Sequence, residues 1–417
     1  MQQMRCKQTM QEKRSGEIDM KIIADLHIHS RFSRACSTKI TPSTLAAAAL
    51  EKGINLISTG DFLHNQWLTE IKQNLEPDKD TGFLKIKGPD KGVRFMLGTE
   101  VATFFWEKGK SKRVHTCIMI KNMESISQLR DVLSKAGNLD IDGRPILSMS
   151  TSELVEKVIN IERDAFIFPA HLWTPYFGAL GETTGFDSIK EAYEDMEKYI
   201  YAYESGLSSD PKMNWMVSQL DKYALISNSD AHSLEKLGRE ANVFDVNKIE
   251  YNEIFKAIKE KDKTKFTSTI EFYPEEGKYH YDGHRQCNFS LKPGKTSDRI
   301  CPVCKKPLVI GVMHRVIELA DREEGYIPNN AIPYTHQIPL REIISFVIKK
   351  GIGTQAVENK YKEFIKAFGT EFNALNSSFD AISKIDHDIA EMIEKIRKNE
   401  IKIIPGYDGV FGKFELL

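Results

Sequence analysis

The first 230 residues contain seven short apolar runs, separated by longer segments in which polar and apolar residues alternate at helical spacing. Short runs rich in Ile, Leu, Val and Phe and bounded by polar residues are typical of buried strands. They lie at residues 21–23, 55–59, 94–98, 114–120, 165–169, 199–203 and 225–228.

The segments between these runs predict helices. One helix is expected to begin after Thr41, with a proline in its first turn, and to end before Gly53. Others are expected at residues 150–161, behind a Ser-x-x-Glu capping pattern, and at 248–261. Strands that alternate with helices predict an α/β fold of the barrel type.

The last ninety residues predict helices at 338–348, 355–368 and 379–397. Between the first two, Gly351-Ile352-Gly353 resembles the turn of a helix-hairpin-helix motif, which offers backbone amides to a DNA phosphate. The chain ends with the glycine-rich segment 405–412, which we expect to dock against another domain.

These patterns suggest four parts. We expect a disordered leader over 1–19, a barrel over 20–275, a small metal-binding domain over 276–325 and a helical domain over 326–417. The leader is polar and has no apolar segment of the kind found in signal peptides.

Composition limits the partners and the cellular location that we expect for the protein. The chain has 58 basic and 59 acidic residues, so any nucleic-acid surface must be local rather than global. No apolar run approaches the ~18 residues that a membrane span needs. Six cysteines and no export signal favour a location in the reducing cytoplasm. If the partner is nucleic acid, we expect the protein at the nucleoid.

Potential metal ligands cluster around the predicted strands. In the segment that follows the first run, His27 and His29 are two residues apart, so both imidazoles point to the same side of an extended chain. Further candidates lie near the ends of the later runs: Asp61, His64, Glu100, His115, His171, Asp230 and His232. Because the sites of β/α barrels lie at one rim, we expect these side chains to converge there.

A second metal site is indicated beyond the barrel. The spacing of His284, Cys287, Cys301 and Cys304 fits two knuckles that bind one tetrahedral structural zinc, with His280 as an alternative to His284. Several basic residues surround these knuckles, and they either contact nucleic acid or are simply solvated: Lys292, Lys295, Arg299, Lys305 and Lys306.

Two loops are candidates for substrate contacts. In the first, Arg31 and Arg34 would bind a phosphate while Phe32 stacks on a base, unless this is a surface loop with one packed phenylalanine. In the second, Trp173 and Tyr176 would wall a base-sized pocket, although a hydrophobic lid is the commoner use of such residues.

The ordered motifs identify a superfamily. Asp-x-His-x-His-Ser at 25–30, Gly-Asp at 60–61, a lone glutamate, a strand histidine, Pro-Ala-His at 169–171 and Ser-Asp-Ala-His at 229–232 resemble the PHP (polymerase and histidinol phosphatase) phosphoesterases. The resemblance implies a distorted seven-stranded β/α barrel with two or three divalent metal ions, whether Zn, Mn, Fe or Mg.

The resemblance also implies a role for each ligand. One metal would be held by the catalytic residues His27, His29, Glu100 and Asp230. Glu100 would bridge to a second metal, which His115 and His171 also hold, and Asp61 and His232 would belong to a third position.

Two departures from the superfamily pattern concern that third position. Many members have a histidine where this chain has Ala35, and Thr-Asp-His where this chain has Gly-Asp-Phe at 60–62. The third position is therefore expected to be weaker, to recruit Cys36 or His64, or to be empty.

The order of modules resembles one family. A PHP barrel followed by the His-x-x-Cys and CPVCKKPL knuckles, IPLREII at 338–344 and PGYDGVFG at 405–412 is similar to the endonuclease Q family across residues 20–417. The resemblance implies a monomeric DNA repair endonuclease that acts on duplex DNA, with a replication sliding clamp considered as a further partner.

The family implies a defined reaction. The enzyme would cut the phosphodiester 5′ to uracil, hypoxanthine, xanthine or an abasic site, leaving a 3′-hydroxyl and a 5′-phosphate, with the damaged nucleotide flipped out. No serine or cysteine nucleophile motif is evident, so we expect attack by a metal-bound hydroxide. The alternatives are a phosphatase of small phosphomonoesters, as in histidinol phosphatases, and an inactive metal-containing module that only binds DNA.

Overall fold

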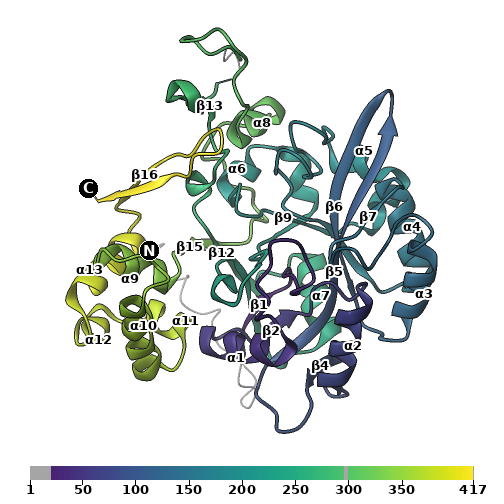
Figure 1. The fold of residues 1–417 in the computed structure, drawn as a ribbon, viewed down its shortest axis with the longest axis horizontal. Coiled ribbons are helices and arrows are strands. Elements are labelled where there is room, and N and C mark those ends of the chain that lie inside the picture. The colour runs from purple at the N-terminus through teal and green to yellow at the C-terminus, as the bar shows by residue number, and fades with distance from the viewer. Residues whose placement is uncertain (1–19, 295–298, 417) are drawn as a thin grey trace, which may run out of the picture.

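Seven strands surround an apolar interior in the computed structural model, which describes residues 20–294 and 299–416 (Figure 1). The predicted leader lies outside these residues. The seven are the strands that the sequence predicts: β1 (Met20–Asp25), β2 (Leu56–Ser58), β5 (Arg94–Glu107), β6 (Lys110–Ile120), β8 (Phe166–Pro169), β9 (Ala202–Glu204) and β10 (Ala224–Ile226). Every one of them contributes side chains to the same buried cluster, which includes Leu56, Met96, Cys117, Phe168 and Ile226.

The barrel is distorted by the direction of one strand. β1, β2 and β5 are parallel, but β6 runs antiparallel to both β5 and β8. β9 and β10 are parallel to each other and meet their neighbours through the bridges Ile167–Ile200 and Ile28–Ala231. Because β6 is reversed, it runs from beyond the rim where the parallel strands end back into the barrel, and its middle, around His115, lies at that rim.

The sheet also extends beyond the barrel. β1 pairs antiparallel with β11 (Ala241–Val246), which is followed by β12 (Phe266–Glu271) and β15 (Tyr334–His336). The hairpin of β3 (Leu75–Asp78) and β4 (Phe83–Ile86) pairs with the beginning of β5, and the short β7 (Ile146–Leu147) pairs with its middle.

Helices cover the outside of the barrel. They are α1 (Pro42–Lys52), α2 (Asn65–Asn74), α3 (Ser125–Leu133), α4 (Thr151–Ile161), α5 (Ile189–Tyr193), α6 (Pro211–Trp215) and α7 (Tyr251–Glu260). α1 has the predicted ends: the Thr41 side chain accepts the Thr44 N–H, and Gly53 adopts a left-handed φ of 93°. The predicted α/β fold is confirmed.

The C-terminal helices form a core of their own, with buried Leu340, Tyr361 and Ile393 among its members. The helices are α9 (Leu340–Val347), α10 (Gln355–Phe368), α11 (Glu371–Asn376), α12 (Phe379–Ser383) and α13 (His387–Arg397). The single helix predicted for 379–397 is therefore wrong, because Asp386 accepts the Ile389 N–H and begins a new helix instead of continuing the old one.

The chain ends in a hairpin, β16 (Ile401–Ile404) and β17 (Lys413–Leu416), whose turn reaches the metal-binding segment that contains β13 (Asp282–His284) and β14 (Phe289–Leu291) (Figure 1). The Tyr281 N–H donates to the Gly406 carbonyl at 3.0 Å, and the Gly409 N–H donates to the Lys278 carbonyl at 3.0 Å. The glycine-rich end docks against another part of the chain, as predicted. α8 (Val312–Leu319) follows the metal-binding segment.

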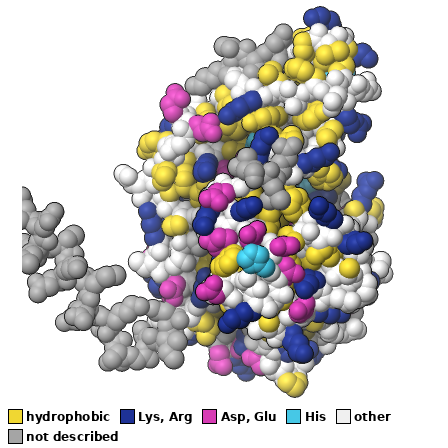
Figure 2. Space-filling model, turned by 90° about the vertical axis from the view of Figure 1, so that its left-hand side faces the viewer, with side chains coloured by type: hydrophobic (Ala, Val, Ile, Leu, Met, Phe, Trp, Pro, Cys, Tyr) yellow, Lys and Arg dark blue, Asp and Glu magenta, His cyan; other side chains and the backbone are white. Residues whose placement is uncertain are grey.

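Surface charge is mixed on the face that Figure 2 shows, where basic and acidic side chains lie interspersed among apolar ones. This agrees with the near-neutral composition and leaves any nucleic-acid contact to local features. Within residues 20–294 and 299–416, no helix combines the length and the apolar character that crossing a membrane requires.

A buried carboxyl group makes stability depend on pH. Glu271 is fully buried, and its oxygens accept the hydroxyls of Ser205, Ser227 and Thr269. Burial raises the pKa of Glu271 to about 8. Between its ordinary pKa near 4.5 and pH 8, the folded protein binds this proton and the unfolded protein does not, so stability falls as pH rises through that window.

We therefore expect the free energy of unfolding to fall by about 1–3 kcal/mol between pH 6 and pH 8, and to fall less in Glu271→Gln. Glu240 is also buried and has a raised pKa, so it contributes to the same dependence of stability on pH. Part of that dependence should therefore remain in Glu271→Gln. Urea unfolding at several pH values measures this, with the exposed Glu260→Gln as the control. Identical slopes in Glu271→Gln and wild type would contradict the assignment.

Candidate metal centre

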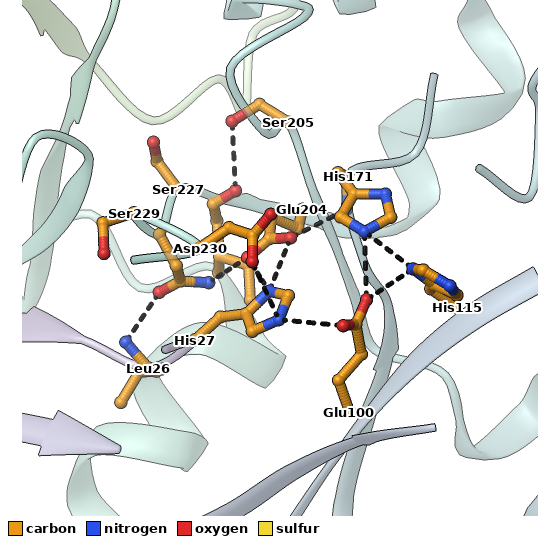
Figure 3. A network of polar contacts seen from close by, with 12 residues as sticks. Leu26, His27, Glu100, His115, His171, Glu204, Ser205, Ser227, Ser229 and Asp230 are labelled. Carbon is orange, nitrogen blue, oxygen red and sulfur yellow. Dashed lines mark hydrogen bonds and ion pairs between the residues drawn. The ribbon is translucent and has the colours of Figure 1, made fainter. Parts of the chain in front are cut away.

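Six of the predicted ligands converge at one rim of the barrel. Figure 3 labels all of them except His29. Most of them follow the end of a strand, whereas β6, which is reversed, contributes its residue from its middle. The six are His27 and His29 after β1, Glu100 on β5, His115 on β6, His171 after β8 and Asp230 after β10.

The first group consists of His27, His29 and Asp230, whose ligand atoms lie within 4.8 Å of one another. His29 Nε2 lies 3.1 Å from Asp230 Oδ1 and 3.1 Å from Glu100 Oε2. The Nε2 atoms of both histidines and Asp230 Oδ1 are buried without a hydrogen-bond partner. Unpaired buried polar atoms are costly, and a bound cation is what such a set would satisfy.

The second group consists of Glu100, His115 and His171, which also lie within 4.8 Å of one another. Glu100 Oε1 is 2.8 Å from His115 Nδ1 and 3.0 Å from His171 Nε2. One oxygen of Glu100 therefore faces the first group and the other faces the second. This is the arrangement of a carboxylate that bridges two metal ions, and the donor set fits the implied metals.

The electrostatics of Glu100 and His115 suit metal binding. Burial opposes ionisation of Glu100, yet His115 and Arg144 beside it hold its pKa well below its usual range. Burial lowers the pKa of His115 to about 4, so its imidazole is neutral at pH 7 and has a lone pair to donate. A carboxylate and neutral imidazoles are the ligand forms that bind divalent cations.

Two buried carboxylates orient the histidines. Glu204, at the end of β9, lies 3.0 and 3.1 Å from His27 Nδ1 and accepts the His171 backbone N–H at 2.7 Å. Asp61 Oδ1 lies 3.0 Å from His29 Nδ1. When each Nδ1–H donates to a carboxylate, the Nε2 lone pairs are left for a metal, which is how outer carboxylates usually support histidine ligands.

The structure places Asp61 differently from the prediction that it binds a third metal. Its Oδ1 faces His29, and its Oδ2 accepts the Ser30 N–H at 2.6 Å and the Ser33 hydroxyl at 2.9 Å. Both oxygens are thus engaged with the protein, and the carboxylate acts behind His29.

The other candidates for a third position are also outside the two groups. His232 donates from Nδ1 to the Asp230 carbonyl at 2.8 Å and packs against the His29 ring. His64 stacks on Phe32 with ring centroids 4.5 Å apart. Cys36 is partly buried, and none of the three joins a ligand group among the described residues. The third metal position stays a prediction.

The backbone is strained at three of these residues. Asp61, His171 and Asp230 have φ values of 46°, 30° and 46°, in a region that residues other than glycine rarely adopt. Such strain persists where surrounding contacts enforce it, and it clusters at functional sites.

Two residues of the centre were not predicted. The sequence gives one indication for Glu204: like several predicted ligands, it is a carboxylate at the end of a predicted strand. Arg144 lies in a loop without any pattern, and its Nη1 is 3.1 Å from Glu100 Oε2. The loop approaches this closely because Gly143 precedes Arg144: a Cβ there would lie 2.3 Å from both Asp61 Oδ2 and Ser33 Oγ.

The residues of the two predicted substrate loops differ in exposure and in their partners. Trp173 is fully buried and donates from Nε1 to Asn214 Oδ1 at 2.8 Å, which favours packing over the role of a pocket wall. Arg31 is paired with Glu70, and Phe32 is partly buried against His64. Arg34 and Tyr176 are exposed and stay candidates for substrate contacts.

The predicted zinc ligands also converge. The ligand atoms of His284, Cys287, Cys301 and Cys304 lie within 4.8 Å of one another, whereas His280 lies outside this group. Burial opposes ionisation of Cys301, but the backbone N–H groups of Cys304 and Val303 lower its pKa to about 7. A thiol that ionises this readily is suited to metal binding.

Glu204→Gln tests the orienting role. The amide cannot accept from His27, Asn228 and the His171 backbone as the carboxylate does, so we expect metal affinity or activity to fall about 10–100-fold with folding intact. Metal titration of the metal-free protein, monitored by calorimetry and by activity, measures this. An unchanged metal affinity would contradict the role.

Comparison with known proteins gives family models for two segments of the chain. A family model described as PHP-associated matches residues 221–262, and one described as the MJ0043 C-terminal domain matches residues 339–400. The protein MJ0043 of Methanocaldococcus jannaschii is 39% identical over 238 residues, which is 55% of this chain and 29% of that protein. The match therefore spans less than a third of that relative.

Two solved structures are similar over nearly the whole chain. The lesion-specific endonuclease PfuEndoQ of Pyrococcus furiosus superposes with a TM-score of 0.84 and 32% identity, covering 95% of this chain and 96% of that one. Endonuclease Q in complex with a 27-mer duplex that has an abasic lesion at the active site superposes with a TM-score of 0.83 and 31% identity, covering 95% and 97%. With this identity over this coverage, the chain belongs to the endonuclease Q family.

Proposed function

We propose that this protein is a metal-dependent DNA repair endonuclease that hydrolyses the phosphodiester on the 5′ side of a deaminated base or an abasic site. The observation that carries the proposal is Glu100, whose two oxygens face two separate groups of metal ligands. The similarity to an endonuclease Q complex with an abasic duplex supports DNA as the substrate.

The metals would be held by His27, His29, Asp230 and Glu100 in the first group, and by Glu100, His115 and His171 in the second. Imidazole ligands suit Zn or Fe, and the carboxylates of the same site also accept Mn or Mg. Two such cations, when bound, would neutralise the phosphate and lower the pKa of a water nucleophile.

The protein's own groups prepare this site. Glu204 and Asp61 hold two imidazoles with their Nε2 atoms toward the centre. Arg144, whose side chain is about a quarter exposed, extends from solvent to Glu100 and is suited to contact a phosphate oxygen at the open side. Arg144 takes the role that the sequence suggested for Arg31, because Arg31 is paired with Glu70.

The rest of the reaction is proposed from the family. A lesion that weakens stacking or pairing lowers the cost of moving a nucleotide out of the duplex, which would favour deaminated and abasic positions over normal ones. The products would be a 3′-hydroxyl and a 5′-phosphate.

The experiment is a cleavage assay on end-labelled duplexes that carry uracil, hypoxanthine, an abasic site or no lesion, with Zn²⁺, Mn²⁺ or Mg²⁺ added separately. We expect one cut immediately 5′ of each lesion and none in the undamaged duplex. Phosphate release from a small monoester without any cut would instead identify a phosphatase. Binding of the lesion duplex without cleavage under any metal would identify a DNA-binding module.

A further inference from the structure

A two-stranded arm rises from the metal centre. The β5–β6 ladder continues without interruption from Leu97–Ile120 to Glu107–Lys110, seven residues beyond Glu100. At ~3.3 Å per residue, the arm extends about 23 Å past that ligand. Figure 1 shows it as the two long strands that project beyond the barrel beside α5.

One face of the arm continues the face that carries the metal ligands. Side chains alternate along a strand, and directly paired residues share a face. Glu100, Phe104 and Trp106 therefore lie on one face of β5, together with His115 and Arg113 on β6, which pair with Ala102 and Phe104. We name Phe104, Trp106, Arg113 and the adjoining Ile146 the arm face.

The opposite face is covered by the protein. Phe105 stacks against Phe186 with centroids 6.2 Å apart, and Lys112 Nζ lies 3.9 Å from the centre of the same ring. Packing therefore fixes the arm from behind and leaves the arm face toward the open side.

Two apolar side chains of the arm face are exposed, while Phe104 and Arg113 are half-buried. Trp106 is 70% exposed and Ile146, which pairs with Ala102 from β7, is 60% exposed. Large apolar side chains that gather on a surface mark an interaction site more often than scattered ones do. Their position beside the metal centre links this surface to the substrate.

An aromatic and cationic track connects the metal centre to the tip. Phe177 stacks on His115 with centroids 4.3 Å apart, and Arg113 lies 6.0 Å from the Phe177 ring and 5.1 Å from the Phe104 ring. Arg113 has no carboxylate partner within residues 20–294 and 299–416, so its charge is available to a ligand.

The composition of the arm favours nucleic acid over protein as its partner. Between Ala102 and Val114 the sequence has one acidic residue, Glu107, and four basic ones, in a chain whose net charge is −1. Flat aromatic surfaces with guanidinium groups and local positive charge are the features that bind bases and phosphates of a nucleic-acid strand.

We propose that the arm face binds the DNA strand that leads away from the cleaved phosphodiester, with Arg113 on a backbone phosphate and Trp106 stacked on a base. This inference rests on the proposed function and adds a contact surface to it. Trp106 lies six residues beyond Glu100, about 20 Å, which corresponds to about six nucleotides at 3.4 Å each.

Single-turnover cleavage of the abasic 27-mer duplex tests the proposal. In Trp106→Ala we expect the protein concentration at half-maximal rate to rise about 5- to 100-fold, the range expected for the loss of one stacked base, while the rate at saturation changes little. Trp106→Phe should restore most of the affinity, because stacking needs only an aromatic face.

Truncating the duplex locates the contact. When fewer than about six base pairs remain on the side that the arm reaches, Trp106→Ala and wild type should bind equally weakly, since the base that Trp106 contacts is then absent. The side whose truncation removes the difference gives the direction in which the strand leaves.

Ile327→Ala is the matched control. Ile327 is 65% exposed. In the same loop, Asn330 donates to the carbonyl of Asp221, which precedes β10, so the loop lies at the end of that strand opposite the metal rim. We expect no change in this variant. If wild type cuts the duplex and Trp106→Ala binds and cuts it equally well, the arm proposal is overturned. If wild type cuts no duplex, the proposed function itself fails.

Discussion

Glu100→Gln is expected to abolish strand cleavage, with a loss of at least about 10³-fold, because one side chain serves both ligand groups. An amide has one neutral oxygen where the carboxylate has two that share a negative charge, so glutamine cannot offer an anionic oxygen to both ligand groups. We expect the metal content of the barrel to fall as well. Single-turnover cleavage of a lesion duplex and elemental analysis of dialysed protein measure the two effects.

A second buried glutamate provides the control. Glu162 is 5% exposed and accepts hydrogen bonds from Asn122 and Ser125. It belongs to neither of the two ligand groups of the barrel. Glu162→Gln has the same chemical change and is expected to keep the metals and the activity. Normal cleavage by Glu100→Gln, or equal losses in both variants, would refute the bridging role.

Cys301→Ser is expected to remove one zinc per chain and to weaken duplex binding about tenfold while the barrel stays folded. Cys301 is buried, and its thiol is one of four converging ligands, so the remaining three cannot complete a tetrahedral site. The C-terminal hairpin docks on the same segment through Tyr281 and Lys278, and its protection from proteolysis should fall too.

Lys306→Ala separates metal loss from charge loss. Lys306 is exposed on the same knuckle, and its carbonyl accepts the Cys301 N–H, an interaction that alanine retains. We expect full zinc content and at most a small change in duplex binding. Zinc content that is unchanged in Cys301→Ser would exclude the four-residue site.

Local patterns determined much of the fold in advance. Apolar runs predicted all seven barrel strands because burial on both faces of a strand requires continuous apolar sequence. The spacing of His284, Cys287, Cys301 and Cys304 predicted their convergence, since two short knuckles need little long-range information to meet. Candidate ligands at strand ends likewise followed from periodicity and the position of sites in barrels.

Roles within the centre depended on packing between segments far apart in the chain. A carboxylate near a strand end looks the same in sequence whether it binds a metal or supports a histidine, so the sequence alone does not show that Asp61 and Glu204 contact His29 and His27. Trp173 followed the same logic, because only the packing around it distinguishes a buried tryptophan from a pocket wall.

The direction of β6 was decided by the tertiary structure alone. Hydrophobic periodicity specifies a strand and its faces but not which way the strand runs beside its neighbour. Reversing β6 brings His115 to the rim and lets β5 and β6 continue outward as one ladder. The sequence by itself determined that metal ligands and apolar strands would form a barrel. Only the pairing of distant strands decided that two ligand groups share Glu100 and that an exposed aromatic arm stands beside them.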